Sequence, residues 1–279
     1  MLIDFLNEYY QADLETIHDV AGNMHLTGHS ERFVCDLFVK IFKDKAKFYA
    51  EQHVNQVYCP DIYLDNVIYE DNYVIVLKDR VMNDVEKEDL TPTKVYQFGE
   101  KLALFHASLT GKVSVPNDKR TLSQRLEEQV AKFTGTAYET EVNEIFSRLE
   151  EDLAPADTDY ELLPKVVLHG DFSIRNLMLY GEHEVLIDFE RAHMGVAYED
   201  LIKFFFNEVN ELDLRNEFIA GYRSQKELEI PNYSLQHCLL FLCALDILEF
   251  HLTHEKQKFG QMAHEMFETI KQGTAVLEL

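Results

Sequence analysis

The sequence lacks the features that would place the chain in or across a membrane. No apolar run approaches the roughly 18–20 uncharged residues needed to cross a bilayer. The first eight residues, MLIDFLNE, have no basic start and already carry acids, unlike a signal peptide. We therefore expect a cytoplasmic protein with no membrane partner.

Cysteine is scarce, and its spacing offers neither a zinc site nor a disulfide framework. No C-x-x-C pair occurs among the four cysteines, which are Cys35, Cys59, Cys238 and Cys243. Isolated cysteines of this kind are typical of reduced thiols. The sequence also contains no internal repeat and no low-complexity segment.

Basic residues are few: 26 lysines and arginines stand against 50 acids, a formal net charge of −24. Such a field repels phosphate backbones, and no local basic patch offsets it, so we expect no nucleic-acid partner. The excess acid has two readings. It could attract a cationic substrate, or it could simply keep the protein soluble.

The residues that are present divide the chain into a strand-rich start and a helix-rich remainder. Residues 33–42 are dominated by β-branched and aromatic side chains and predict a buried strand. A helix is expected over 44–58, and two short strands over 62–69 and 73–77 around a polar turn. Together with a strand pair ahead of residue 33, these elements predict a small α+β lobe.

Beyond residue 77 the pattern becomes helical. Residues 83–89 are polar and acidic and predict a linker. Thr91-Pro92 is typical of a helix start, with threonine as N-cap, and that helix should run to about residue 109. We expect a helical region over 122–153 that breaks near Gly135, short strands at 166–168 and 185–187, and helices from 201 to the end.

Two acids, Asp171 and Asp188, each follow a short apolar strand. A strand fixes the backbone, so a carboxylate that leaves it is held in place. Asn176 lies five residues after Asp171. Phosphoryl transfer uses such a set, with one carboxylate for the hydroxyl proton and an amide oxygen plus a second carboxylate for Mg²⁺. The alternative is two unrelated strand ends with solvated acids, but so many specified residue types rarely occur together by chance.

Lys40 stands in the otherwise apolar strand 33–42, where a lysine is rare unless it meets a partner. Glu51 lies at helical spacing with the apolar residues of the helix that follows. A Lys40–Glu51 pair would direct the ammonium toward ATP phosphates. Alternatively, Lys40 is a strand-edge charge and Glu51 pairs with Lys47.

A phosphate-covering loop is expected at residues 21–30, between two strands ahead of Lys40. The backbone amides of Gly22 and Asn23 could cover phosphates, although the segment holds only two glycines. A simple β-turn explains the same residues.

The residues His169-Gly170-Asp171 with Asn176, followed by Ile187-Asp188-Phe189-Glu190, resemble the signature of the aminoglycoside phosphotransferase and choline kinase family, which is related to the protein kinases. Residues 98–106 look like that family's G-x-x-L-A-x-x-H helix. Residues 192–201 are similar to its G-x-P-x-x-D-L segment, with Ala197 where proline is usual. The matches run from about residue 40 to residue 201.

This resemblance implies an α+β, protein-kinase-like fold of two lobes. Residues 1–80 would form a small antiparallel-sheet lobe that binds the nucleotide, and residues 81–279 a larger, mostly helical catalytic lobe. The backbone of residues 77–81 would be the hinge that reads the base, which leaves ATP and GTP both open.

The resemblance also implies roles for single residues. Asp171 would be the catalytic base, Asn176 and Asp188 the Mg²⁺ ligands, and Asp200 a brace for the loop. His169 would be structural and not a proton carrier.

The acceptor side is less specified. Asp246 and Glu249 interrupt the apolar segment 238–250 and could bind an ammonium group. Alternatively, they could form the solvent-exposed edge of an ordinary amphipathic helix. Glu190 could line the acceptor site or touch a second metal, or be a solvated acid.

We therefore expect an ATP- and Mg²⁺-dependent enzyme that phosphorylates a hydroxyl of a small molecule, such as an aminoglycoside-like antibiotic or an amine or sugar metabolite. One alternative is a catalytically silent nucleotide-binding regulator of the same fold, motivated by the glycine-poor loop. A protein kinase is disfavoured because Asp188-Phe189-Glu190 stands where D-F-G would be, and no activation-loop insert precedes Asp200.

Overall fold

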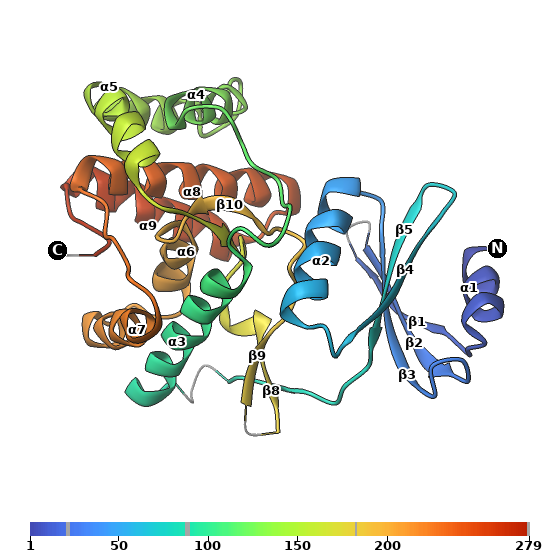
Figure 1. The fold of residues 1–279 in the computed structure, drawn as a ribbon. Coiled ribbons are helices and arrows are strands. Elements are labelled where there is room, and N and C mark those ends of the chain that lie inside the picture. Colours follow the sequence, from blue (N-terminus) through green and yellow to red (C-terminus); the bar gives the residue numbers. More distant parts are fainter. Residues whose placement is uncertain (21–22, 87–89, 182, 278–279) are drawn as a thin grey trace.

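The computed structural model describes residues 1–20, 23–86, 90–181 and 183–277. Figure 1 shows two lobes, a sheet lobe built from the N-terminal part of the chain and a helical lobe built from the rest. This arrangement confirms the expected protein-kinase-like class of fold.

The small lobe is a five-stranded antiparallel sheet with the order β1-β2-β3-β5-β4. Its strands are β1 (Glu15–Val20), β2 (Asn23–Ser30), β3 (Cys35–Phe42), β4 (Tyr63–Tyr69) and β5 (Asn72–Lys78). Helix α1 (Leu2–Tyr10) packs on one face, where Leu6 and Tyr10 share a core with Val39. Helix α2 (Lys45–Tyr58) packs on the other, where Phe48 meets Phe42. Because side chains alternate along β3, Lys40 points to the α2 face.

Helix α2 contributes to two cores. Phe48 belongs to the core beneath the sheet, whereas Ala50 and Val54 belong to the core of the large lobe. Asp44 caps the helix by accepting hydrogen bonds from the backbone N–H groups of Ala46 and Lys47. The helix therefore lies between the lobes, with one face on each.

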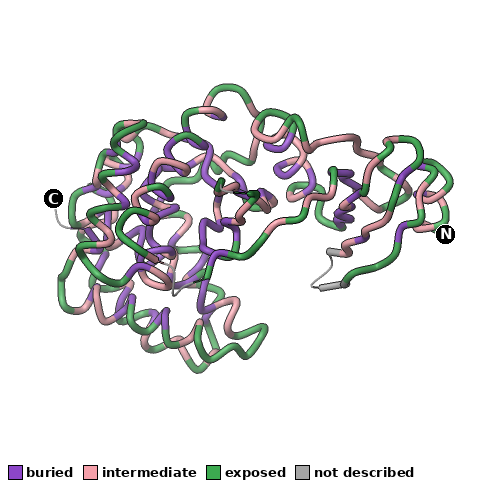
Figure 2. Tube along the Cα trace, turned by 90° about the horizontal axis from the view of Figure 1, so that it is seen from below, coloured by how far each residue is buried: buried purple, intermediate pink, exposed green. Residues whose placement is uncertain are grey.

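The large lobe is built around α8 (Tyr233–His254), which contacts α4 (Leu122–Ala131), α5 (Glu139–Leu162), α6 (Glu199–Asn207) and α9 (Gln257–Gln272). By length and composition alone α8 could cross a membrane, but 61% of its most apolar window is buried inside the protein. Figure 2 shows buried segments gathered in the interior of this lobe.

Helices α3 (Pro92–Leu109) and α7 (Leu212–Gln225) pack backbone to backbone. A Cβ atom on Gly221 would lie 1.9 Å from the carbonyl oxygen of Tyr96, and one on Gly99 would lie 2.0 Å from that of Phe218. Only glycine allows this approach.

Short strands hold the loops between the lobes. Strand β7 (Lys165–Leu168) pairs with β10 (His193–Val196), and β8 (Leu177–Tyr180) pairs with β6 (Asn83–Asp84) and β9 (His183–Leu186). A single 3-10 turn, Ile174–Asn176, leads into β8. Residues 169–176, hereafter the 169–176 loop, and residues 187–192 are therefore both anchored at each end.

The expected elements were confirmed with local differences. The strand predicted from residue 33 begins at Cys35, because Val34 adopts a positive φ of 55°. The helix predicted to end near 153 continues through Pro155 to Leu162. The N-terminal helix α1 and the strands β8 and β10 were not predicted, and the linker expected at 83–89 begins with the two-residue strand β6.

Candidate active site

Lys40 meets two acids at the boundary between the lobes. Its ammonium nitrogen lies 2.7 Å from Oε1 of Glu51 and 3.0 Å from Oδ1 of Asp188. Lys40 and Glu51 are buried, whereas the Asp188 side chain is 39% exposed to the cleft. Burial alone would lower the pKa of Lys40, but the two carboxylates outweigh it and raise that pKa above its ordinary value. Lys40 is therefore a fixed cation.

Asp188 lies just beyond β9 in an unusual backbone conformation. Its φ is +67°, in the left-handed region that non-glycine residues rarely adopt. The preceding residue is fixed, since the N–H of Ile187 donates to the carbonyl oxygen of Asn176 over 3.1 Å. The conformation turns Asp188 toward Lys40 on the opposite lobe.

The start of the 169–176 loop is held by Asp200. One carboxylate oxygen of Asp200 accepts a hydrogen bond from the backbone N–H of His169 at 2.7 Å and lies 3.1 Å from Nε2 of His106. The other oxygen accepts a hydrogen bond from the backbone N–H of Gly170 at 2.9 Å. Burial would raise the pKa of Asp200, but His106 and the backbone donors lower it below its ordinary value. Asp200 therefore stays ionised and fixes the loop.

The His169 ring is fully buried and contacts the carbonyl oxygen of Ile187 through Nε2, at 3.0 Å. Phe105, Phe172 and Phe189 surround it. Burial lowers the pKa of this histidine, so the ring is neutral at pH 7. Its geometry suits a scaffold that ties the loop to residue 187.

Gly170 is required by the path of the loop. Its φ is +77°, and a Cβ atom there would lie 2.2 Å from the carbonyl oxygen of Arg191. The backbone just before Asp171 therefore rests directly on the backbone of Arg191.

Asp171 is held by two cations. Lys203, on α6, places its ammonium 2.5 Å from Oδ1, and Arg175 contacts Oδ2. Burial would raise the pKa of Asp171, but these cations lower it below the ordinary value. Sequence analysis did not identify Lys203. The available signal was a lysine three residues after Asp200, within the otherwise apolar stretch of α6.

Asn176 completes the loop. Its Nδ2 donates to the carbonyl oxygen of Asp171 over 2.9 Å, which fixes the amide and leaves Oδ1 with no hydrogen-bond donor among the described residues. The side chain is buried at the floor of the cleft.

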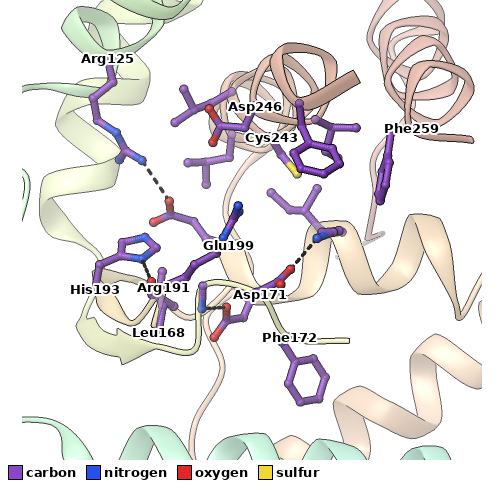
Figure 3. Close-up of a pocket in the computed structure, with 18 of the residues that line it drawn as sticks. Arg125, Leu168, Asp171, Phe172, Arg191, His193, Glu199, Cys243, Asp246 and Phe259 are labelled. Atoms are coloured by element: carbon purple, nitrogen blue, oxygen red, sulfur yellow. Dashed lines mark hydrogen bonds and ion pairs between the residues drawn. The ribbon is translucent and has the colours of Figure 1, made fainter. Parts of the chain in front are cut away.

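Two pockets meet at this loop. The larger, about 620 Å³, lies between the lobes and is lined by Lys40, Glu51, Asn176, Asp188 and the segment Leu77–Arg80. The smaller, about 200 Å³, lies within the large lobe and is lined by Asp171, Arg191, Lys203 and Asp246 (Figure 3). The 169–176 loop therefore presents Asn176 to one pocket and Asp171 to the other.

The remaining predicted residues fall at different places. Asp246 lines the smaller pocket and accepts a hydrogen bond from Gln129 at 2.7 Å. Glu249 does not line it and pairs with Lys132 at 2.8 Å. Glu190 lines neither pocket and pairs across the lobes with Lys47 at 2.9 Å.

The segment expected to cover phosphates, residues 21–30, is strand β2 from Asn23 to Ser30, so for these residues the prediction of a loop was wrong. Asn23 begins β2 and pairs with Val20 of β1. Gly22 lies outside the described residues. In the same sheet, His25 of β2 pairs with Lys40 of β3.

Comparison with known proteins places this arrangement in a family. Residues 39–233 match the model of the phosphotransferase enzyme family. No curated protein sequence matches the chain.

Solved structures share the fold over nearly the whole chain. The chain is similar to aminoglycoside phosphotransferase APH(4)-Ia, with 15% identity, 98% of each chain covered and a TM-score of 0.66. It is similar to the choline kinase LicA from Streptococcus pneumoniae, with 15% identity, 98% of each chain covered and a TM-score of 0.65. It is also similar to spectinomycin phosphotransferase APH(9)-Ia in complex with ADP and spectinomycin, with 16% identity, 99% of this chain and 95% of that chain covered, and a TM-score of 0.61.

The family model spans more than half of the chain, including Lys40, the 169–176 loop and Asp200. The chain therefore belongs to the phosphotransferase enzyme family and is a small-molecule kinase.

Proposed function

We propose that the protein transfers the terminal phosphoryl group of ATP, with Mg²⁺, to a hydroxyl group of a small molecule. The observation that carries this proposal is the position of the 169–176 loop between two pockets. Asn176 and Asp188 line the larger one, and Asp171 lines the smaller. A phosphoryl group leaving a nucleotide in the first would meet a hydroxyl held in the second.

The larger pocket suits the nucleotide. Its volume of about 620 Å³ lies within the roughly 300–1,000 Å³ typical of drug-sized ligands. Lys40 is a fixed cation at its inner wall, where it would neutralise phosphate charge. The similar spectinomycin phosphotransferase structure contains ADP. At the hinge, the N–H groups of Lys78 and Asp79 already donate to Ile62 and Asp36, so they are not free to read a base.

The donor set in this pocket fits Mg²⁺. Asp188 offers a carboxylate that is partly exposed to the cleft, and Asn176 offers Oδ1 of a fixed amide, and both are hard oxygen ligands. Asp188 and Asn176 would hold the ion, which would shield charge on the ATP phosphates. Lys40 would then shift its contact from Asp188 toward a phosphate.

Asp171 would orient the acceptor hydroxyl and take its proton as the new O–P bond forms. Its lowered pKa keeps it ionised at neutral pH but makes it a weak base. Phosphoryl transfer through a loose transition state depends more on positioning and charge neutralisation than on base strength. Lys203 and Arg175, which hold Asp171 in place, suit that requirement. His169 and Asp200 would position the loop without touching substrate.

The test is Asp171→Asn in purified protein. Nucleotide binding, measured by calorimetry with Mg-ATP, should remain within about threefold, because Asp171 does not line the larger pocket. ADP release with an acceptor should fall by about 10²–10⁴-fold, the range typical of general acid–base groups. Retained turnover would overturn the assignment of Asp171.

A silent regulator of the same fold is the second candidate, supported by the scarcity of glycine in residues 21–30, where only two glycines occur. It predicts nucleotide binding without any acceptor-dependent ADP release. Mg²⁺-dependent ADP release with any small hydroxyl compound would exclude it.

A further inference from the structure

The smaller pocket holds charges of both signs, although the chain as a whole is strongly acidic. Four cationic side chains line it, and these are Arg125, Arg175, Arg191 and Lys203. Four acids line it as well, namely Asp171, Glu199, Asp200 and Asp246. A pocket that only had to attract a polycation would not need four cations at its wall. Which of these charges are already paired decides what a ligand would meet.

Most of the charges are satisfied within the protein. Arg125 pairs with Glu199 at 3.4 Å, and Tyr160 donates to the same glutamate over 2.8 Å. Lys203 and Arg175 both hold Asp171. Asp200 is buried against the 169–176 loop, as described above.

Arg191 and Asp246 are the exceptions. The exposed guanidinium of Arg191 makes no hydrogen bond or ion pair with the part of the chain that the structure describes. Asp246 accepts one hydrogen bond, from the neutral amide of Gln129, and forms no ion pair with a described residue. Figure 3 shows Asp246 entering the pocket from α8, opposite the loop that carries Asp171. One unpaired cation and one unpaired carboxylate therefore face the same space.

The backbone of Arg191 is also held against the 169–176 loop. Its backbone carbonyl lies against Gly170, where a Cβ atom would approach to 2.2 Å, and the same carbonyl lies 2.8 Å from Nδ1 of His193. The backbone that carries the Arg191 guanidinium is therefore anchored directly beside the loop that carries Asp171.

The pocket is also small. Its volume of about 200 Å³ lies below the roughly 300 Å³ at which drug-sized ligands begin. A compact metabolite fits this space better than a three-ring antibiotic does.

We propose that the acceptor is a small zwitterion, a hydroxyl compound whose carboxylate is bound by Arg191 and whose ammonium group is bound by Asp246. This inference rests on the proposed kinase function. Phosphoryl transfer to the hydroxyl breaks the terminal P–O bond of ATP, forms an O–P bond on the acceptor, and releases ADP and one proton.

Three matched probes isolate the two charges. L-Homoserine carries a hydroxyl, an ammonium and a carboxylate; 4-hydroxybutyrate lacks the ammonium, and 3-amino-1-propanol lacks the carboxylate. With Mg-ATP, kcat/KM from ADP release should be highest for the zwitterion, by about tenfold or more over each single-charge analogue. Choline and kanamycin serve as cationic comparisons.

Variants then connect each charge to its residue. Arg191→Gln should raise KM for the two carboxylate-bearing probes by about tenfold or more and leave that for 3-amino-1-propanol nearly unchanged. Asp246→Asn should raise KM for the two ammonium-bearing probes, L-homoserine and 3-amino-1-propanol. It should leave KM for 4-hydroxybutyrate nearly unchanged. Arg148→Gln, on α5 where Arg148 pairs with Glu144, is the matched control and should change KM for none of the probes.

Each outcome decides the inference. Preference for choline, kanamycin or 3-amino-1-propanol over the zwitterion would overturn it and leave the kinase proposal standing. An equal effect of Arg191→Gln on all three probes would also overturn it, because a general structural role would act alike on every acceptor. If no probe supports ADP release, the zwitterion inference falls, whereas the kinase proposal falls only if no other small hydroxyl compound supports ADP release either.

Discussion

The ammonium of Lys203 lies 2.5 Å from Oδ1 of Asp171, so a cation from α6 neutralises the loop carboxylate before any substrate binds. Arg175 shares that carboxylate from the other side. The proposed base therefore has a depressed pKa, and its strength depends in part on Lys203, which lies outside the recognised motif.

Lys203→Met should move the pH dependence of turnover. Lys203 lowers the pKa of Asp171, so its removal raises that pKa, and the acid limb of kcat/KM should shift to higher pH. Lys203→Arg keeps the positive charge, so the acid limb of its kcat/KM profile should stay at the wild-type pH. A profile in Lys203→Met identical to that of the wild type would show that Lys203 does not control the ionisation of Asp171.

Lys40→Met should destabilise the protein as well as inactivate it. The substitution leaves Glu51 buried without its cation, and breaking a buried pair in this way costs about 3–5 kcal/mol. The double variant Lys40→Met/Glu51→Leu should regain much of the free energy of unfolding in urea but no activity. A double variant as unstable as the single one would contradict this account.

Asp200→Asn should lower the free energy of unfolding by about 2–4 kcal/mol at pH 7, because one of its two oxygens can no longer accept from the loop N–H groups. The pKa of Asp200 is depressed in the fold. Its contribution is therefore fully present above the unfolded value of about 3.9 and is lost as pH falls through the lower folded pKa.

Urea unfolding of wild type and Asp200→Asn at several pH values between 7 and 3 measures that window. The difference in unfolding free energy between wild type and Asp200→Asn should shrink only below about pH 4. Asp71→Asn, in the exposed turn between β4 and β5, is the matched control and should show no comparable loss. A difference that stays constant to pH 3 would mean that the charge of Asp200 does not stabilise the fold.

Gly221→Ala should separate α3 from α7. Its Cβ atom would meet backbone at 1.9 Å, which no side-chain rotation relieves, so we expect a loss of about 2 kcal/mol or more in unfolding free energy. Gly111→Ala meets nothing within 4 Å and should cost about 1 kcal/mol, for its positive φ alone. Equal costs at both positions would argue against tight packing of these helices.

Residues in local patterns could be predicted from the sequence. Lys40 and Glu51 stand in a strand and the helix that follows it, so alternation and helical spacing are enough to bring them together. Asp171 and Asn176 share one loop with a recognisable motif. Each predicted contact needed only short-range geometry.

Other features depend on distant parts of the chain. Lys203 reaches Asp171 across 32 residues, and the pairing of Glu190 with Lys47 spans 143. No local pattern shows that Glu249 turns toward Lys132 while Asp246, one turn earlier on α8, enters the pocket. The continuation of α5 through Pro155 likewise opposes local propensity and reflects packing against α8.

The division of α2 between two cores bears on how the protein could be cut into pieces. A fragment ending at the predicted lobe boundary, residue 80, would contain every strand of the small sheet. It would also uncover Ala50 and Val54, which are buried only because the large lobe covers them. Such a fragment, produced alone, should be prone to aggregation, because the exposed apolar face of α2 would pack against a neighbouring copy of the fragment.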